Sequence, residues 1–312
     1  MVKEVNSISF QEDFFFWTEA AIEKPIIDLK KAVSDSLPLS IDSGTLEQAT
    51  SVKQIANQIN AVAQKYEFQS ESIRLTIPSR FSIIKKITID DSIPEEDYPD
   101  IISFEFSRSW DESPENYHLY LPDYLRRRNG YKELLAIGLR KKVLEFFERI
   151  GEEAKIGVES ISPTCFTVDE FFRTLYPDKE GQTLLVGCQR RGYDLLILDQ
   201  INFLHYSFKP YSSNLDKIDQ LDEEDIVSNF ESVFEELQHP PVLQEPIFHI
   251  NSIFFYGFHF KPNWLDLIRE ELNIPVGLLN FENSSTYQVK AENSQVKSSE
   301  LFQFVEPISN IF

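Results

Sequence analysis

The 312-residue chain is 42% hydrophobic and 26% charged, an ordinary globular composition that suffices for one large domain or two medium ones. Its 30 basic and 51 acidic residues give a formal net charge of −21, which argues against nucleic acid as a partner because like charges repel. No apolar run approaches the ~20 residues that span a bilayer, and the N-terminus has no signal-peptide pattern, so we expect membrane association only through a partner.

The N-terminal third predicts short strands around one amphipathic helix. Apolar stretches bounded by turn residues predict strands at 5–10, 13–20, 25–27, 72–78 and 82–90. Residues 37–49 read as a polar loop, and the apolar residues after it are spaced by three and four, which predicts a helix over 50–66. The acidic stretch 90–100 fits a loop or the start of a helix.

The segment 117–140 predicts a long β-hairpin. Asn129 and Gly130 supply the positive φ angles of a type I′ turn, and Pro122 indicates an edge strand or a bulge. The arginines at 126–128 lie beside this turn, where they fit either an anion-binding patch or a charged hairpin tip. We favour the hairpin tip.

A helix, a strand and a second helix follow the hairpin. The first helix is predicted over 141–150, with Gly151 as its C-cap. The strand covers 154–163. Thr167 and Glu170 have the spacing of a capping box, which predicts that the second helix opens there.

The C-terminal part begins with another hairpin, whose apolar runs over 183–203 flank a turn of glycine and arginine and continue to Phe208. Beyond it the pattern predicts, in order, a helix at 226–237, a strand at 253–260, a helix at 262–272, a strand at 275–279, a loose polar segment at 283–300 and a short closing helix.

Motifs of known catalytic sites are missing from the sequence. It contains no CxxC, HExxH, GxSxG, P-loop or GxGxxG pattern, and its five histidines form no ligand pair, so no metal is expected. Cys165 and Cys188 read as buried free thiols. The acidic residues at 169–170 and 223–225 fit the first turns of helices, where carboxylates favour the dipole, so we interpret both as structural.

The alternation of strands and helices with hairpins indicates an α/β or α+β fold with mixed sheets. In four stretches the sequence resembles the actin-like ATPase family, in the branch of the PilM-type pilus assembly proteins and the FtsA-type division proteins. The four stretches are LPLSIDSGTLEQATSVKQIANQI, IRLTIPSRFSIIKKITID, LLAIGLRKKVLEFFERIGEEAKIGVESISPTCFTVDEFF and FFYGFHFKPNWLDLIREELNIPVGLLN. The resemblance covers roughly residues 37–281.

This resemblance implies an actin-like (ribonuclease H-like) two-lobed α/β fold with an inserted subdomain. Residues 1–79 plus 151–180 would form the first actin-like subdomain, and 80–150 the inserted one. Residues 181–312 would form the second lobe, with a reduced small subdomain.

The nucleotide-binding motifs of that family are altered here. The opening hairpin, where the family has aspartate and glycines, reads SISFQEDFFFW and has no glycine. In the second hairpin Gly187 replaces the aspartate, Gln189 the glycine and Tyr193 the threonine. We therefore expect no cofactor and interpret five positions as vestiges of the nucleotide loops: Gly187, Gln189, Gly192, Asp194 and Gly257.

The resemblance implies a cytoplasmic protein that is peripheral to a bacterial inner membrane. We expect a non-catalytic scaffold, a pseudo-ATPase, that binds the cytoplasmic N-terminal segment of a PilN-like single-span protein in a type IV pilus-like, secretion or motility machine. In the family this segment lies between the first and inserted subdomains, so Arg80, Lys85 and Lys86 are candidate contacts. For each of the three taken alone we favour an ordinary solvated strand charge, and a homo-oligomer is left open.

Two alternatives stay open. An active ATPase or a sugar-kinase-like enzyme with divergent loops would need an essential carboxylate, for which Asp13 and Asp194 are the candidates. The missing glycines argue against it. A filament-forming actin homologue ranks last because it would need both the nucleotide and a fuller second lobe.

Overall fold

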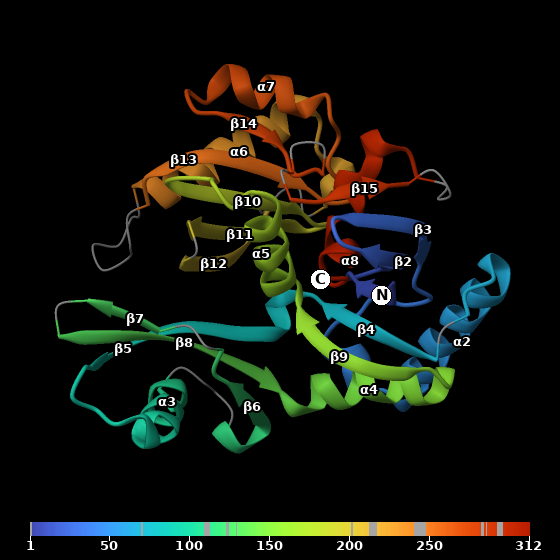
Figure 1. The fold of residues 1–312 in the computed structure, drawn as a ribbon, viewed down its shortest axis with the longest axis horizontal. Coiled ribbons are helices and arrows are strands. Elements are labelled where there is room, and N and C mark those ends of the chain that lie inside the picture. Colours follow the sequence, from blue (N-terminus) through green and yellow to red (C-terminus); the bar gives the residue numbers. More distant parts are fainter. Residues whose placement is uncertain are drawn as a thin grey trace.

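The computed structural model places three β-sheets with helices against them (Figure 1). It describes residues 2–69, 71–108, 113–122, 125–128, 130–200, 202–211, 217–239, 248–281, 284, 286–291 and 296–312. Among these residues no helix is both long and apolar enough to cross a membrane.

The first sheet contains the N-terminal strands. Its order is β15–β3–β2–β1–β4–β9; the first three strands of the chain run antiparallel, whereas β4 and β9 run parallel to β1. The strands are β1 (Lys3–Phe10), β2 (Phe14–Glu23), β3 (Ile26–Ser36), β4 (Ser72–Ile77), β9 (Gly157–Pro163) and β15 (Gln288–Lys290).

The second sheet repeats this topology. Its order is β12–β11–β10–β13–β14, again with three antiparallel strands followed by two parallel ones. The strands are β10 (Gln182–Cys188), β11 (Gly192–Asp199), β12 (Asn202–Pro210), β13 (Ile250–Tyr256) and β14 (Val276–Leu278). The turn between β1 and β2 is therefore equivalent to the turn between β10 and β11.

Helices form layers around these two sheets (Figure 1). The outer face of the first sheet packs on α1 (Ser43–Leu46), α2 (Ala49–Tyr66) and α4 (Lys141–Ala154). The outer face of the second sheet packs on α6 (Glu223–Gln238) and α7 (Trp264–Glu271). Between the sheets lie α5 (Thr164–Leu175) and α8 (Val305–Ser309), in a core to which both sheets contribute.

The third sheet is formed by the part of the chain that connects β4 to α4. Its strands are β5 (Ser82–Asp90), β6 (Tyr117–Tyr120), β7 (Leu125–Arg128) and β8 (Tyr131–Arg140). Both β6 and β7 pair with β8, and α3 (Tyr98–Ser107) covers one face over a separate small core. Short 3-10 helices lie at Ser79–Phe81, Glu95–Asp97, Pro114–Asn116, Ile218–Gln220 and Ser298–Phe304.

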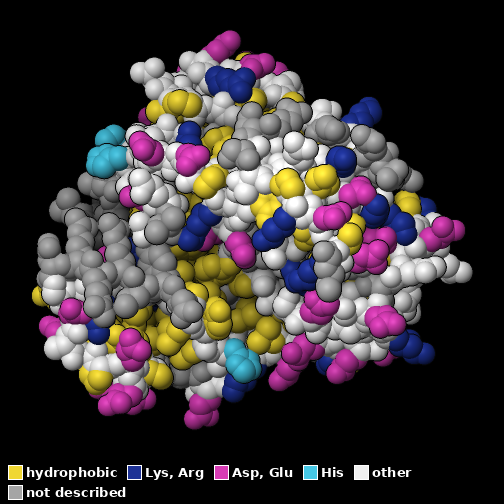
Figure 2. All heavy atoms as spheres, viewed as in Figure 1, with side chains coloured by type: hydrophobic (Ala, Val, Ile, Leu, Met, Phe, Trp, Pro, Cys, Tyr) yellow, Lys and Arg dark blue, Asp and Glu magenta, His cyan; other side chains and the backbone are white. Residues whose placement is uncertain are grey.

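One face of the molecule is shown in Figure 2. Hydrophobic side chains gather near its middle, where the third sheet meets α5, while acidic and basic side chains are mixed over the rest. The mixed charges fit the ordinary surface of a globular protein.

The predicted strands and helices are mostly confirmed, with shifts at their ends. The predicted helix 141–150 extends to Ala154, so the prediction of Gly151 as its C-cap is wrong. A Cβ at Gly151 would lie 2.4 Å from Cγ2 of Val158, so glycine is needed where α4 packs on β9. Lys155 ends the helix instead, in the left-handed conformation.

The predicted capping box at Thr167 and Glu170 is also wrong, because α5 begins earlier, at Thr164. Thr164 donates its hydroxyl to the carbonyl of Ile77, and the amide of Cys165 donates to Ser79 Oγ, so contacts with the end of β4 fix the start of this helix. The acidic residues 169–170 accordingly lie beyond its first turn, whereas 223–225 do open α6 as predicted.

Two loop predictions need correction. The loop 37–49 contains the short helix α1, and the segment 283–300, predicted to be loose, contains β15, which pairs with Ile26–Asp28 of β3. The hairpin 117–140 is confirmed and is interrupted near Pro122 between β6 and β7. Asn129 and the side chains at 126–128 lie outside the described part of the chain.

Candidate functional site

The two equivalent turns, Gln11–Asp13 after β1 and Gln189–Arg191 after β10, lie beside each other. Each is closed by the same backbone hydrogen bond, from the amide of its glutamine to the carbonyl three residues later, at 2.9 Å in both. Gln11 and Gln189 therefore hold equivalent positions in the two halves of the fold.

The residues after the two glutamines have opposite charges and pair with one another. Arg190 forms an ion pair with Asp13, and Nε of Arg191 lies 2.9 Å from Oε1 of Glu12. The Glu12 and Asp13 side chains are only 8% and 13% exposed, so solvent screens these pairs less than surface pairs. We call these four residues the turn clasp.

A carboxylate from the C-terminal helix α8 bridges the two turns. Oε2 of Glu306 accepts hydrogen bonds from Nε2 of Gln11 (3.0 Å) and Oγ of Ser9 (3.3 Å), and Oε1 accepts one from Nε2 of Gln189 (2.7 Å). Glu306 is 2% exposed. This burial raises the pKa of the Glu306 carboxyl to about 7, although the hydrogen bonds from Gln11, Gln189 and Ser9 act in the opposite direction.

Asp194 and Gly187 lie directly behind the second turn, opposite each other on β11 and β10. Asp194 is buried and accepts a hydrogen bond from the Tyr206 hydroxyl at 2.6 Å; burial raises the pKa of its carboxyl. A Cβ at Gly187 would lie 2.7 Å from the hydroxyl oxygen of Tyr256, so this tyrosine occupies the space of a carboxylate side chain at 187.

The space between the turns does not fit a nucleotide. The cavity there measures about 10 Å³, which is room for about one water. Its walls carry Glu12 and Asp13, which are paired with Arg80 and Arg190 of the same lining, and the buried Asp194. No group of three or more His, Cys, Asp or Glu that could hold a metal ion occurs among the described residues.

Of the predicted vestigial positions, Gln189 and Asp194 line this cavity. The three glycines do not: Gly187 lies one residue before the end of β10, Gly192 begins β11, and Gly257 directly follows β13 beside Cys188. The sequence reasoning missed the bridging residue, Glu306, which lies 295 positions from Gln11 and therefore gives no local signal.

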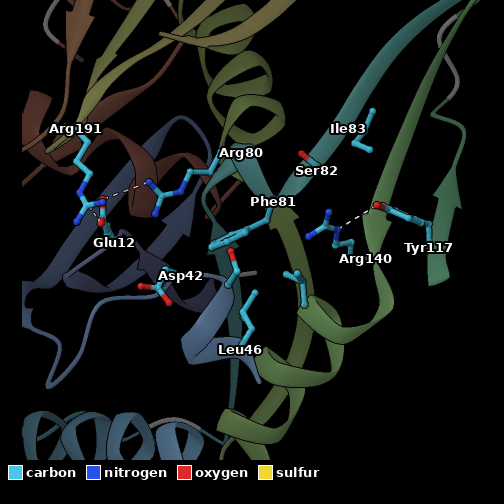
Figure 3. Close-up of a pocket in the computed structure, with 12 residues that line it drawn as sticks. Glu12, Asp42, Leu46, Arg80, Phe81, Ser82, Ile83, Tyr117, Arg140 and Arg191 are labelled. Carbon is cyan, nitrogen blue, oxygen red and sulfur yellow. Dashed lines mark hydrogen bonds and ion pairs between the residues drawn. The ribbon is translucent and has the colours of Figure 1, made fainter. Parts of the chain in front are cut away.

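A larger cavity, of about 320 Å³, lies between the first sheet and the third sheet (Figure 3). We call it the intersheet cavity. Apolar side chains and three arginines from separate segments dominate its lining: Leu46, Phe81, Ile83, Val143, Arg80, Arg140 and Arg191. It also contains Glu12 of the turn clasp, so the cavity and the clasp share a wall.

The arginines of the intersheet cavity are held by defined contacts. Arg80 donates to Oε2 of Glu12 (3.4 Å) and to the carbonyl of Ile41 (3.3 Å). Nε of Arg140 donates to the Tyr117 hydroxyl at 3.1 Å. These bonds orient the guanidinium groups along the cavity wall, as Figure 3 shows.

Of the three candidate partner contacts, Arg80 lies in this wall, and the other two do not line the cavity. Lys85 donates to the carbonyl of Glu105 on α3, and Lys86 pairs with Glu133 on the neighbouring strand at 3.4 Å. Sequence reasoning missed Arg140 and Arg191 in the cavity lining. The two arginines in the turn of the 183–203 hairpin were the available signal for Arg191.

Solved structures establish the fold. A PilM–PilN type IV pilus biogenesis complex superposes with a TM-score of 0.72 at 12% identity, over 99% of this chain and 96% of that one. The likeness confirms the predicted actin-like two-lobed fold.

Two further solved structures are less similar. The ethanolamine utilization protein EutJ of Carboxydothermus hydrogenoformans has a TM-score of 0.48 at 8% identity, covering 98% and 88% of the two chains. The cytoplasmic domain of EpsL, an inner-membrane component of the Vibrio cholerae type II secretion system, has a TM-score of 0.47 at 8% identity, covering 97% of this chain and 94% of that one. No protein-family model and no curated protein matches the sequence.

Proposed function

We propose that this chain is a non-catalytic scaffold, a pseudo-ATPase of actin-like fold that works without nucleotide. The observation that carries the proposal is the bridge from Glu306 to Gln11 and Gln189. In actin-like ATPases the two equivalent turns bind phosphate. Here a protein carboxylate joins them and leaves room for about one water.

The contacts of the candidate carboxylates support a scaffold over an active ATPase. Asp13 is paired with Arg190, and Asp194 is buried beneath the hydroxyl of Tyr206. A hydrated magnesium ion needs an accessible carboxylate oxygen. Reaching either group would first require breaking an ion pair or a buried hydrogen bond.

The scaffold would bind a cytoplasmic segment of a PilN-like, single-span inner-membrane protein. The likeness to the PilM–PilN complex motivates this partner, and the intersheet cavity is where we place the segment. Its apolar wall of Leu46, Phe81 and Val143 would bury hydrophobic side chains. The chain would then be cytoplasmic, peripheral to the membrane, and part of a type IV pilus-like, secretion or motility machine.

Photo-crosslinking in cells of the native host tests this proposal. The photoreactive p-benzoylphenylalanine replaces Phe81, which lines the cavity, or, as a control, Phe104, which is 63% exposed on α3. We expect the probe at position 81 to crosslink a membrane protein through a segment outside its membrane span, identified by mass spectrometry. The probe at position 104 should not capture that protein.

A membrane protein captured equally at both positions, or none captured at position 81, would contradict docking in the cavity. Melting curves of both labelled proteins must match the wild type, so that loss of folding is not mistaken for loss of binding.

A further inference from the structure

Strand β5 forms one edge of the third sheet. It pairs with β8 on one side, in an antiparallel register that continues into a hydrogen bond of 2.9 Å from the amide of Asp91 to the carbonyl of Gly130. The hydrogen bonds of an antiparallel pair alternate along each strand. The odd-numbered residues of β5 therefore bond to β8, and the backbone groups of the even-numbered residues point away from it.

The two ends of this edge are closed by short-range hydrogen bonds, whereas its middle is open. The amide of Ser82 donates to the carbonyl of Ser79, and the carbonyl of Asp90 accepts from the amide of Ile93 at 3.1 Å. Neither group bonds to β8, as the alternation requires. Within the described part of the chain, three residues between these ends each present one N–H and one C=O that have no hydrogen-bond partner: Ile84, Lys86 and Thr88.

The other edge strands of the described sheets are short or irregular. Strands β14 and β15 have three residues each, and β6 and β7 have four. Strands β9 and β12 are longer, but each pairs through a shifted register and ends on a proline, Pro163 or Pro210. Bulges and prolines protect a free edge from further pairing. Strand β5 has nine residues, a continuous register and no proline, so its edge is open to another strand.

The side chains of β5 show what such a strand would contact. The ammonium group of Lys86 is paired with Glu133, so the backbone of Lys86, rather than its charge, is available to a partner. Ile83 and Ile87 pack in the small core beneath α3, whereas Ile84 packs against the core between the other two sheets. An added strand would bring its own side chains beside these two faces at alternate positions.

We infer that the partner segment bound in the intersheet cavity continues along β5 as an added strand, with backbone hydrogen bonds to Ile84–Thr88 and apolar side chains at alternate positions. The inference rests on the proposed function, because Ser82 and Ile83 begin β5 and also line the cavity. A second copy of this chain is a poorer occupant, since two molecules of net charge −21 repel one another. Segments that bind as added strands owe their affinity to main-chain hydrogen bonds.

Selection from a phage-displayed library of random 12-residue peptides, with the full chain as bait, tests the inference. We expect enriched peptides to carry apolar residues at every second position. Synthetic copies of the most enriched peptide, each methylated at one backbone nitrogen, should then alternate in affinity. Methylation of an amide that donates to β5 should weaken binding about tenfold, and methylation of the next amide should leave binding unchanged.

Variants of the edge test the same contact from the side of the protein. Thr88 is exposed and its N–H points away from β8, so Thr88→Pro should keep the melting temperature of the wild type and bind the peptide about tenfold more weakly. Thr88→Val retains the N–H, is the matched control and should bind as the wild type does. If Thr88→Pro fails to fold, the methylated peptides still decide the question.

Blocking the cavity separates strand addition from docking in the cavity. Ser43 is exposed and lines the cavity, so Ser43→Trp should fill it and weaken every selected peptide. Peptides that this change blocks but that ignore Thr88→Pro and show no alternation on methylation would overturn strand addition and leave docking in the cavity standing. Selection of no peptide that Ser43→Trp blocks would overturn the proposed docking as well.

Discussion

Glu306 is a carboxyl group at a buried position, where loss of water destabilises its ionised form. It is almost fully buried, and three side-chain donors surround it, one from β1 and one from each of the two turns. Donors of this kind favour the ionised form, while loss of water favours the protonated form, and burial is the larger influence because the pKa is raised to about 7. The residue can thus bridge the two lobes and still titrate near neutral pH.

Stability should consequently depend on pH through Glu306. The unfolded carboxyl has a pKa near 4.5 and the folded one about 7, so the folded state binds the proton more tightly. The stabilisation that comes from this tighter proton binding is fully present below pH 4.5 and is lost as the pH rises through 7. Glu306→Gln cannot titrate, so between pH 5 and 8 the wild type should lose on the order of 2 kcal/mol relative to this variant.

Urea unfolding of both proteins at pH 5, 6, 7 and 8 measures this difference. Glu270→Gln, which changes an exposed glutamate on α7, is the control and should follow the wild type throughout. If Glu306→Gln also follows the wild type at every pH, the buried carboxyl does not titrate in this range.

At the scale of elements, the turn clasp joins the two halves of the fold. The two turns are closed by the same backbone hydrogen bond but have complementary sequences, Gln-Glu-Asp and Gln-Arg-Arg. Removing one member of a largely buried ion pair takes away the opposite charge that stabilises the other member. This destabilises the protein more than removing both charges does. Asp13→Asn and Arg190→Gln should each destabilise the chain by about 2 kcal/mol, and the double variant by clearly less than their sum.

A double-mutant cycle in urea gives the coupling energy, which we expect to be at least about 1 kcal/mol. The pair Asp266–Arg269 on α7 serves as the control: its side chains are 78% and 47% exposed, so its coupling should be much smaller. Additive losses at Asp13 and Arg190 would mean that the clasp does not hold the turns together.

Local patterns predicted the elements whose ends are set by neighbouring residues. The helix over 50–66 and the 183–208 hairpin follow from apolar spacing and turn residues, which act within a few positions. Strand β15 could not be predicted in this way, because the three residues Gln288–Lys290 become a strand only by pairing with β3, some 260 positions earlier. The actin-like fold could be predicted because it depends on the order of elements rather than on their ends.

The candidate site could be predicted from the sequence only in part, because some of its contacts join residues far apart in the chain. The missing glycines at the two turns are local, and from them we expect no phosphate to bind there. The side chains that join the turns are not local: Glu306 and the paired charges of the clasp come together only when both lobes are folded. Likewise Arg140 joins Arg191 in one cavity only through the packing of the third sheet.

At the scale of the whole molecule, two lobes with the same topology meet at their equivalent turns. An actin-like ATPase joins such turns through a bound nucleotide, so ligand binding stabilises the folded protein. Here side chains of the protein join the two turns directly, through hydrogen bonds and ion pairs. A ligand that must first displace buried, hydrogen-bonded carboxylates loses much of its binding free energy in doing so.

Magnesium-ATP should therefore leave the melting temperature unchanged. A ligand at one hundred times its Kd would stabilise the native state by about 2.7 kcal/mol, which raises the melting temperature by a few degrees. We expect no saturable shift up to roughly 5 mM Mg-ATP, against magnesium sulfate of equal ionic strength as the control for salt. Calorimetric titration should show no heat of binding. A saturable, magnesium-dependent rise would show that the lobes can open to nucleotide despite the Glu306 bridge, and the active ATPase would then become the better account of this chain.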